Sequence, residues 1–190
     1  HDETLERTTN GSGHVASTDF AAISRLDAGS WFGASFAKNE VPTLEEVLGL
    51  LAGRVMLNIE LKPDTRVEPL VRRVVTAVAR FELFEAVIFS SFRVEALRSL
   101  RRLVPDARVG VLCERGGLHD ALALAGELGA VALHPAATMV DTDLVREAHG
   151  RKLAVYPWTV NEPGEIALLR ALDVDGIFTD YPDRVARPRR

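Results

Sequence analysis

The sequence has few of the features that would assign it to a disulfide-bonded, membrane-spanning or nucleic-acid-binding class of protein. It contains one cysteine, Cys113, so no disulfide can form within the chain, and this fits a reducing, cytoplasmic location. No apolar run approaches the roughly 20 residues that a membrane-spanning helix needs. The net charge is −4, and no basic stripe is interleaved with aromatic residues, so nucleic acid is not an expected partner. We expect one globular domain over residues 1–190, with no indication of its oligomeric state.

Short apolar runs recur along the chain with amphipathic segments between them. The runs begin near residues 55, 86, 108, 131, 152 and 174. Intervals of 21 to 31 residues between these starts are typical of successive βα units. Continuous apolar runs, rather than alternating ones, favour strands covered on both faces, as in a parallel sheet. Helices are predicted at a capping box formed by Thr43 and Glu46, and near residues 70–78, 93–103, 118–128, 142–149 and 162–172.

Polar or aromatic side chains fall at the C-terminal end of each apolar run. They are Glu60 and Lys62, Ser90 and Ser91, Glu114, His134, Trp158, and Asp180. Barrel enzymes build their sites at this rim, whereas a doubly wound sheet places its ligand at one switch point. We therefore predict an α/β fold, a (β/α)8 TIM barrel. About six of the eight βα units are expected here, because such barrels take about 200 residues or more.

The segment Asn58 to Pro63 is the most informative one in the chain. Strand side chains alternate, so Asn58, Glu60 and Lys62 share one face of the predicted strand. A carboxylate and an ammonium on a strand that is otherwise apolar indicate a site at the strand's end, because buried charges need a partner, a metal or a ligand. An internal ion pair or a solvated edge strand would give the same pattern.

Seven short motifs, in order and at suitable spacing, resemble the glycerophosphodiester phosphodiesterase family. They are residues 1–11 (HDETLERTTNG), 27–32 (DAGSWF), 41–46 (VPTLEE), 58–63 (NIELKP), 89–92 (FSSF), 157–161 (PWTVN) and 175–180 (DGIFTD). The similarity covers nearly the whole chain and is greatest to the compact bacterial cytosolic type.

The resemblance implies a (β/α)8 barrel that hydrolyses a small-molecule glycerophosphodiester to glycerol 3-phosphate and an alcohol. It also implies a divalent cation, Mg²⁺ or Ca²⁺. By the same resemblance, Glu60 is a metal ligand, His1 is one of two catalytic histidines, and Lys62 faces the phosphate. Trp158 lines the glycerol or alcohol side of the pocket, although packing at the top of the barrel would also account for it.

The chain departs from the family at two places. The family's His-Arg-Gly motif, with the other catalytic histidine, and its Glu-x-Asp metal motif do not occur in this sequence. The barrel is therefore expected to be N-terminally incomplete. One assigned carboxylate and one assigned histidine are too few for metal-assisted acid–base hydrolysis, so the 190 residues alone are expected to be nearly inactive. The alternative function is a non-catalytic truncated barrel that at most binds a phosphorylated ligand.

Overall fold

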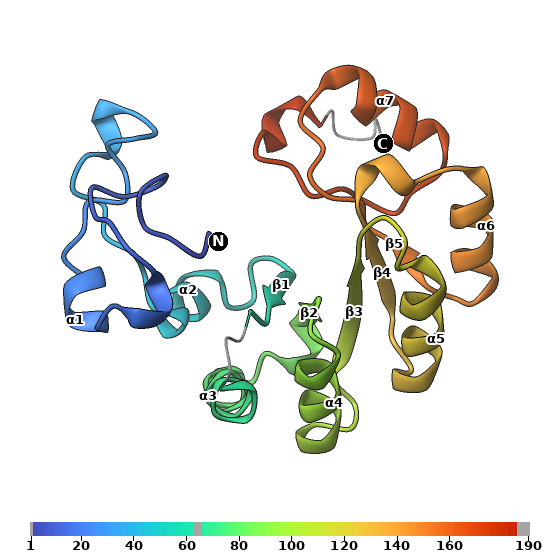
Figure 1. Ribbon diagram of the computed structural model, residues 1–190, viewed down its shortest axis with the longest axis horizontal. Coiled ribbons are helices and arrows are strands. Elements are labelled where there is room, and N and C mark those ends of the chain that lie inside the picture. Colours follow the sequence, from blue (N-terminus) through green and yellow to red (C-terminus); the bar gives the residue numbers. More distant parts are fainter. Residues whose placement is uncertain (1, 63–65, 186–190) are drawn as a thin grey trace. The chain divides into compact units, whose positions relative to one another are not determined.

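The computed structural model describes residues 2–62 and 66–185, and it divides into two compact units. One unit comprises His1–Ala52 and the other comprises Gly53–Arg190. Figure 1 shows short helical turns and loops in the first unit and a layered sheet with helices in the second. A single domain over residues 1–190 stays a prediction, and the two units are described separately.

The N-terminal unit has little regular structure, as its Gly-, Ser- and Thr-rich sequence predicts. Its elements are η1 (Val15–Ser17), α1 (Phe20–Ile23), η2 (Ala34–Phe36) and α2 (Leu44–Leu51). The predicted capping box begins α2, because the Thr43 hydroxyl accepts a hydrogen bond from the Glu46 amide and the Glu46 carboxylate accepts one from the Thr43 amide. A small core of buried side chains includes Leu5, Ile23 and Leu48.

One carboxylate orders the loop between α1 and α2. Asp27 accepts hydrogen bonds from the backbone amides of Gly29, Ser30 and Lys38, at 2.8 to 2.9 Å, and from the Ser30 hydroxyl at 2.6 Å. The Ser30 hydroxyl and these amides hold the pKa of the Asp27 carboxyl well below its usual range. Gly29 is required here, because a Cβ at this position would lie 1.8 Å from the Phe36 carbonyl oxygen.

The C-terminal unit is a five-stranded parallel sheet whose strands follow chain order. The strands are β1 (Leu57–Glu60), β2 (Val87–Ser91), β3 (Arg108–Cys113), β4 (Ala132–Pro135) and β5 (Ala154–Val155). The helices between and after them are α3 (Val67–Arg80), α4 (Val94–Leu103), α5 (Leu118–Leu128), α6 (Thr142–Gly150) and α7 (Pro163–Ala171), and short turns are η3 (Phe84–Ala86), η4 (Ala137–Met139) and η5 (Pro182–Arg184). Consecutive neighbours without a switch point are the arrangement of a TIM barrel, here a partial one.

The two faces of the sheet differ in character. Phe89, Val109 and Leu133 are fully buried, and their strands pack against α4 and α5. Ser90 and Gly110, the next residues along β2 and β3, are register partners on the opposite face. We call the face that carries Ser90 and Gly110 the inner face, because it faces away from the helices that connect the strands (Figure 1).

The sixth predicted strand is not a strand in the structure. Residues 174–180 run beside the chain that follows β5, where the Asp175 amide bonds to Val155 and the Phe178 amide bonds to Pro157. Pro157 has no N–H to donate, so no regular ladder forms between the two segments. The prediction was therefore correct about where the segment lies and wrong about its regular pairing.

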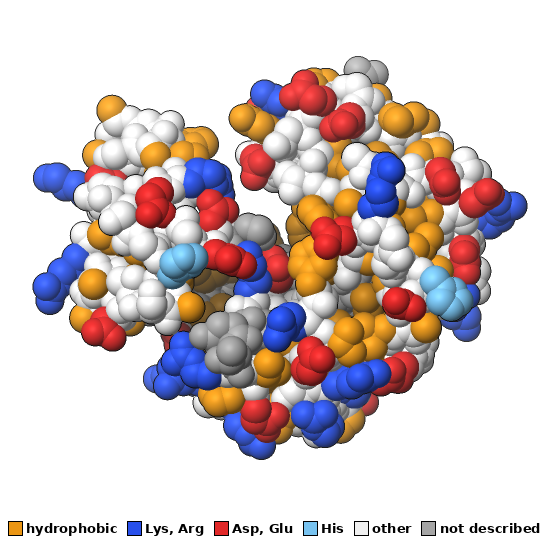
Figure 2. Space-filling model, in the orientation of Figure 1, with side chains coloured by type: hydrophobic (Ala, Val, Ile, Leu, Met, Phe, Trp, Pro, Cys, Tyr) orange, Lys and Arg blue, Asp and Glu red, His pale blue; other side chains and the backbone are white. Residues whose placement is uncertain are grey.

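On the face shown in Figure 2, Lys and Arg side chains are intermingled with Asp and Glu over the C-terminal unit. Among the described residues, no helix combines the length and the hydrophobicity needed to cross a membrane.

Replacing Phe89 tests the assignment of the helix-covered face. Phe89→Ala removes a fully buried ring that contacts Phe84, with ring centroids 6.3 Å apart, and we expect a loss of about 3 to 5 kcal/mol in unfolding free energy. Leu168→Ala, at a side chain that is 61% exposed, should change it by less than about 0.5 kcal/mol. Urea denaturation followed by circular dichroism measures both, and equal losses would contradict the assignment.

Candidate active site at the carboxyl ends of the strands

The end of β1 carries the two charged residues that the sequence singles out. Glu60 is the register partner of Ser90 and therefore lies on the inner face, while Leu61, which is 1% exposed, belongs to the other face. The Leu61 amide bonds to the Ser90 carbonyl at 2.7 Å, and the Ser91 hydroxyl donates to the Leu61 carbonyl at 2.5 Å. These bonds hold the end of β1 against β2, which fixes the position of Glu60 at the sheet's carboxyl edge.

The electrostatic setting of Glu60 is that of a half-buried carboxylate. Burial raises the pKa of Glu60, and the positive charge of Lys62 offsets part of this rise. Nearby, the Asn58 amide donates to the buried Ser90 hydroxyl at 3.0 Å. Glu60, Asn58 and Ser90 thus form a polar patch on a sheet whose other face is apolar. This placement agrees with a site at the end of the strand, and an ion pair between Glu60 and Lys62 remains the alternative.

Trp158 is held at the edge of β4 by three hydrogen bonds. Its amide donates to the Pro135 carbonyl at 3.0 Å, its carbonyl accepts from the Ala137 amide at 2.8 Å, and its indole N–H donates to the His134 carbonyl at 2.9 Å. The indole ring is only half-buried. Its polar atom is therefore used within the protein, and the exposed part of the side chain is aromatic carbon.

Phe92 is a rim residue whose role does not follow from the sequence alone. It follows β2, and its ring meets that of Trp158 edge-to-face, with centroids 5.4 Å apart and an interplanar angle of 89°. The available signal was the alternation in residues 89–92, which puts Phe92 on the same face as Ser90. Sequence spacing alone does not show that rings from β2 and from the segment after β5 touch.

His134 is buried on the inner face of β4. The side chain is 1% exposed, and neither ring nitrogen has a hydrogen-bond partner within residues 2–62 and 66–185. The ring packs edge-to-face against Tyr156 and Phe178 and lies over Gly110, where a Cβ would approach its Cε1 to 2.6 Å. Burial lowers the pKa of His134 to about 4, so the imidazole is neutral near pH 7.

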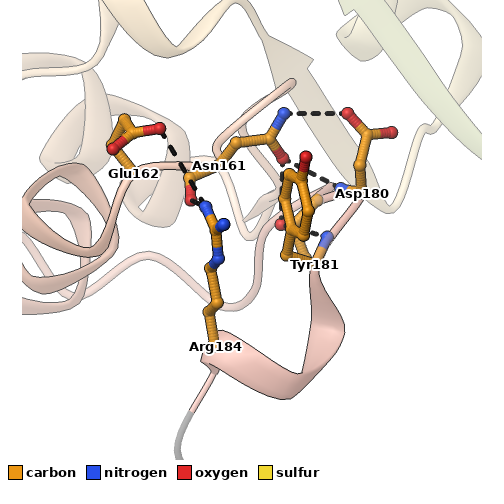
Figure 3. A network of polar contacts seen from close by, with 6 residues as sticks. Asn161, Glu162, Asp180, Tyr181 and Arg184 are labelled. Atoms are coloured by element: carbon orange, nitrogen blue, oxygen red, sulfur yellow. Dashed lines mark hydrogen bonds and ion pairs between the residues drawn. The ribbon is translucent and has the colours of Figure 1, made fainter.

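A polar network fixes the loop that follows Trp158 (Figure 3). The Asn161 amide group accepts from the Asp180 backbone amide at 2.9 Å and donates to the Asp180 carboxylate at 2.8 Å. Arg184 donates to the Asn161 carbonyl at 2.8 Å and lies over the Tyr181 ring, 3.7 Å from its centroid. Asp180 was expected at the rim formed by the carboxyl ends of the strands. Its bonds to Asn161 connect the segment that begins at residue 180 to the loop that follows Trp158.

The described residues fit a divalent cation only in part. No three His, Cys, Asp or Glu side chains are close enough together to hold a metal ion in the described part of the chain. Glu60 is the only assigned carboxylate, whereas Mg²⁺ and Ca²⁺ take about six or more oxygen ligands, some of them from water or substrate phosphate. The predicted catalytic residue His1 lies outside the described residues.

Comparison with known protein families identifies the family of this chain. The model of the glycerophosphoryl diester phosphodiesterase family matches residues 1–184. The chain belongs to this family. A glycerophosphodiester phosphodiesterase of Caldanaerobacter subterraneus subsp. tengcongensis is 34% identical over 185 residues, which cover 96% of this chain and 76% of that protein. One of Bacillus altitudinis is 33% identical, covering 100% of this chain and 79% of that protein.

Solved structures of the phosphodiesterase family confirm the fold. An Oleispira antarctica phosphodiesterase in complex with the product sn-glycerol-3-phosphate has a TM-score of 0.88 and 28% identity, covering 97% of this chain and 75% of that one. A glycerophosphoryl diester phosphodiesterase from Silicibacter pomeroyi has a TM-score of 0.83 at 29% identity, covering 97% of this chain and 75% of that one. The predicted α/β barrel class and the predicted family, a family of phosphoric diester hydrolases, are therefore confirmed.

A substitution at Gly110 tests the close packing of His134. Gly110→Ala places a methyl group against the imidazole, and we expect it to destabilise the protein by about 1 to 3 kcal/mol. Adding His134→Ala should remove the clash, so that the two changes are strongly non-additive in a double-mutant cycle. Gly126→Ala within α5, where nothing lies within 4 Å of a new Cβ, should instead stabilise by about 0.5 to 1 kcal/mol. Additive losses at residues 110 and 134 would contradict the packing.

The neutral state of His134 makes stability depend on pH. The unfolded chain binds a proton near the ordinary histidine pKa of about 6.5, whereas the folded imidazole stays neutral until about pH 4. Stability supplied by this group is therefore present above pH 6.5 and falls as the pH is lowered toward 4. Thermal unfolding of wild type and His134→Gln across this range should show a smaller acid-induced decrease in the variant. Parallel curves would show that His134 is not the titrating group.

Proposed function

We propose that the protein hydrolyses glycerophosphodiesters to glycerol 3-phosphate and an alcohol. The observation that supports this most directly is the position of Glu60 on the inner face at the end of β1, in a family whose Oleispira member binds glycerol 3-phosphate. In barrels, the carboxyl ends of the strands form the active site. The non-catalytic alternative would leave the half-buried carboxylate with a raised pKa as a structural feature only.

Lys62 and Trp158 provide the substrate contacts in this proposal. The Lys62 ammonium follows the strand that carries Glu60 and contacts the phosphate as a positive charge. The half-buried Trp158 lines the glycerol or alcohol side, with its orientation fixed by the bond from its indole N–H to the His134 carbonyl. His1 acts as one of two histidines that move protons, because an imidazole with a pKa near 6.5 can take or give a proton near neutral pH.

Glu60 is proposed as one ligand of a divalent cation, Mg²⁺ or Ca²⁺. One carboxylate, with substrate phosphate and water, provides part of the oxygen set that such ions prefer. When bound, the ion would neutralise charge on the phosphoryl oxygens during displacement. Burial disfavours the ionised form of Glu60 and raises its pKa, and a bound cation would offset this effect by stabilising the ionised carboxylate.

A coupled assay for glycerol 3-phosphate tests the proposal. It compares the 190-residue chain with the same chain fused to strands from a family member that carry the His-Arg-Gly and Glu-x-Asp motifs. We expect the chain alone to be nearly inactive on glycerophosphocholine and glycerophosphoethanolamine. The fused form should release glycerol 3-phosphate, and EDTA should stop it until Mg²⁺ or Ca²⁺ is restored.

Variants of the fused form separate the roles. Glu60→Gln should lower the rate at least about 100-fold and weaken metal dependence, because it replaces a charged metal ligand with a neutral amide of similar shape. His1→Ala should abolish turnover without changing the unfolding midpoint. Leu168→Ala, on the exposed side of α7, serves as the control. Activity that EDTA does not affect would refute the metal role, and no product from the fused form would refute the function.

A further inference from the structure

Trp158 lies in a short loop whose two ends are bonded to one residue of the last segment. The Phe178 amide donates to the Pro157 carbonyl at 2.8 Å, and the Phe178 carbonyl accepts from the Val160 amide at 2.8 Å. Val160 is fully buried, so the end of the loop is anchored in the interior. The position of Phe178 along the chain therefore determines where the loop that carries Trp158 begins and ends.

The Asn161 side chain continues this pairing toward the end of the last segment. Its Oδ1 accepts from the Asp180 backbone amide at 2.9 Å and from the Thr179 hydroxyl at 3.2 Å. Its Nδ2 donates to the Asp180 carboxylate at 2.8 Å (Figure 3). Because Pro157 prevents a regular ladder, a side-chain amide here takes the place of the backbone groups that would set the register of the last segment.

The backbone of Asn161 is held separately from its side chain. Arg184 donates to the Asn161 carbonyl at 2.8 Å, and its guanidinium lies over the Tyr181 ring (Figure 3). The bonds to Asp180 and Thr179, in contrast, use only the side-chain amide. A change in the side chain therefore alters the pairing with the last segment and leaves the bond from Arg184 in place.

We propose that Asn161 and Asp180 are positioning residues for Trp158. Their hydrogen-bonded pair sets the register of the last segment, and this register holds the loop so that the indole lines the pocket. The inference rests on the proposed function, because that function places Trp158 on the glycerol or alcohol side of the substrate. The pair needs one donor and one acceptor, so the negative charge of Asp180 is dispensable.

Exchange of the amide and the carboxylate tests the proposal. Asn161→Asp places two carboxylates together and removes the donated N–H, so the pair should break. Asp180→Asn keeps an oxygen that accepts from Asn161 and should behave like the wild type. The double variant Asn161→Asp/Asp180→Asn again has one donor and one acceptor and should recover wild-type behaviour. Glu162→Gln is the matched control, because it removes a neighbouring carboxylate on a side chain that is 75% exposed.

The emission of Trp158 reports on the loop without requiring turnover. The chain has two tryptophans, so Trp31→Phe leaves Trp158 as the reporter. Acrylamide should quench this emission more strongly in Asn161→Asp, and the double variant should return the quenching to the wild-type level. The unfolding midpoint is measured for every variant. If Asn161→Asp does not fold, Asp180→Ala at this exposed position takes its place, with Asp180→Asn as the variant that keeps the acceptor.

Kinetics of the fused form test the effect on the substrate. Asn161→Asp should raise KM for glycerophosphocholine about 5- to 30-fold with a smaller change in kcat, because a displaced wall weakens binding rather than the chemical step. The double variant should restore KM.

Three outcomes would overturn the proposal. Loss of activity in Asp180→Asn would show that the charge of Asp180 acts directly. A double variant no better than Asn161→Asp would show that the hydrogen-bonded pair is not what matters, and unchanged quenching in Asn161→Asp would show that the pair does not position Trp158. No product from the fused form without these changes would refute the hydrolytic function, and the quenching results would still decide whether the pair positions Trp158.

Discussion

Alternation of side chains along parallel strands is the constraint on which the rest of the C-terminal unit depends. In β2, Phe89 is fully buried on the side that α4 covers, so Ser90 must lie on the opposite face. A shift of one residue would bury Ser90 under the helix and place Phe89 on the inner face. The same alternation places Glu60 at the end of β1 on the inner face and the next residue, Leu61, on the opposite face. Apolar packing on one face therefore determines which polar groups the other face presents.

Packing on the inner face then determines how the polar groups are spaced. Gly110 has no Cβ, and this allows the His134 imidazole to lie over β3 in the row that contains Ser90 and Glu60. The Tyr156 and Phe178 rings flank the imidazole. The backbone carbonyl of His134 accepts a hydrogen bond from the indole N–H of Trp158. A single buried residue thus links the interior of the sheet to the Trp158 side chain at its carboxyl edge. The network of Asn161 and Asp180 secures the chain just beyond.

Much of the fold could be predicted because its signals are local. Helical periodicity and end signals predicted helices at residues 118–128 and 142–149, and the structure has them at Leu118–Leu128 and Thr142–Gly150. Five of the six apolar runs are strands. The sixth run, near residue 174, has the composition of a strand, but its neighbour contains Pro157 and cannot form a regular ladder. Regular pairing depends on the partner segment, which composition alone does not identify.

The sequence by itself determined the family, the βα order and the face on which Glu60 lies. These follow from short motifs and a two-residue period, both of which are readable within a few positions. Only the tertiary structure decided that Phe92 touches Trp158, that Gly110 makes room for His134, and that Asp180 bonds to Asn161. Each of these contacts joins residues from separate strands or loops. Their distance is set by sheet order and curvature, which arise only when the whole unit packs.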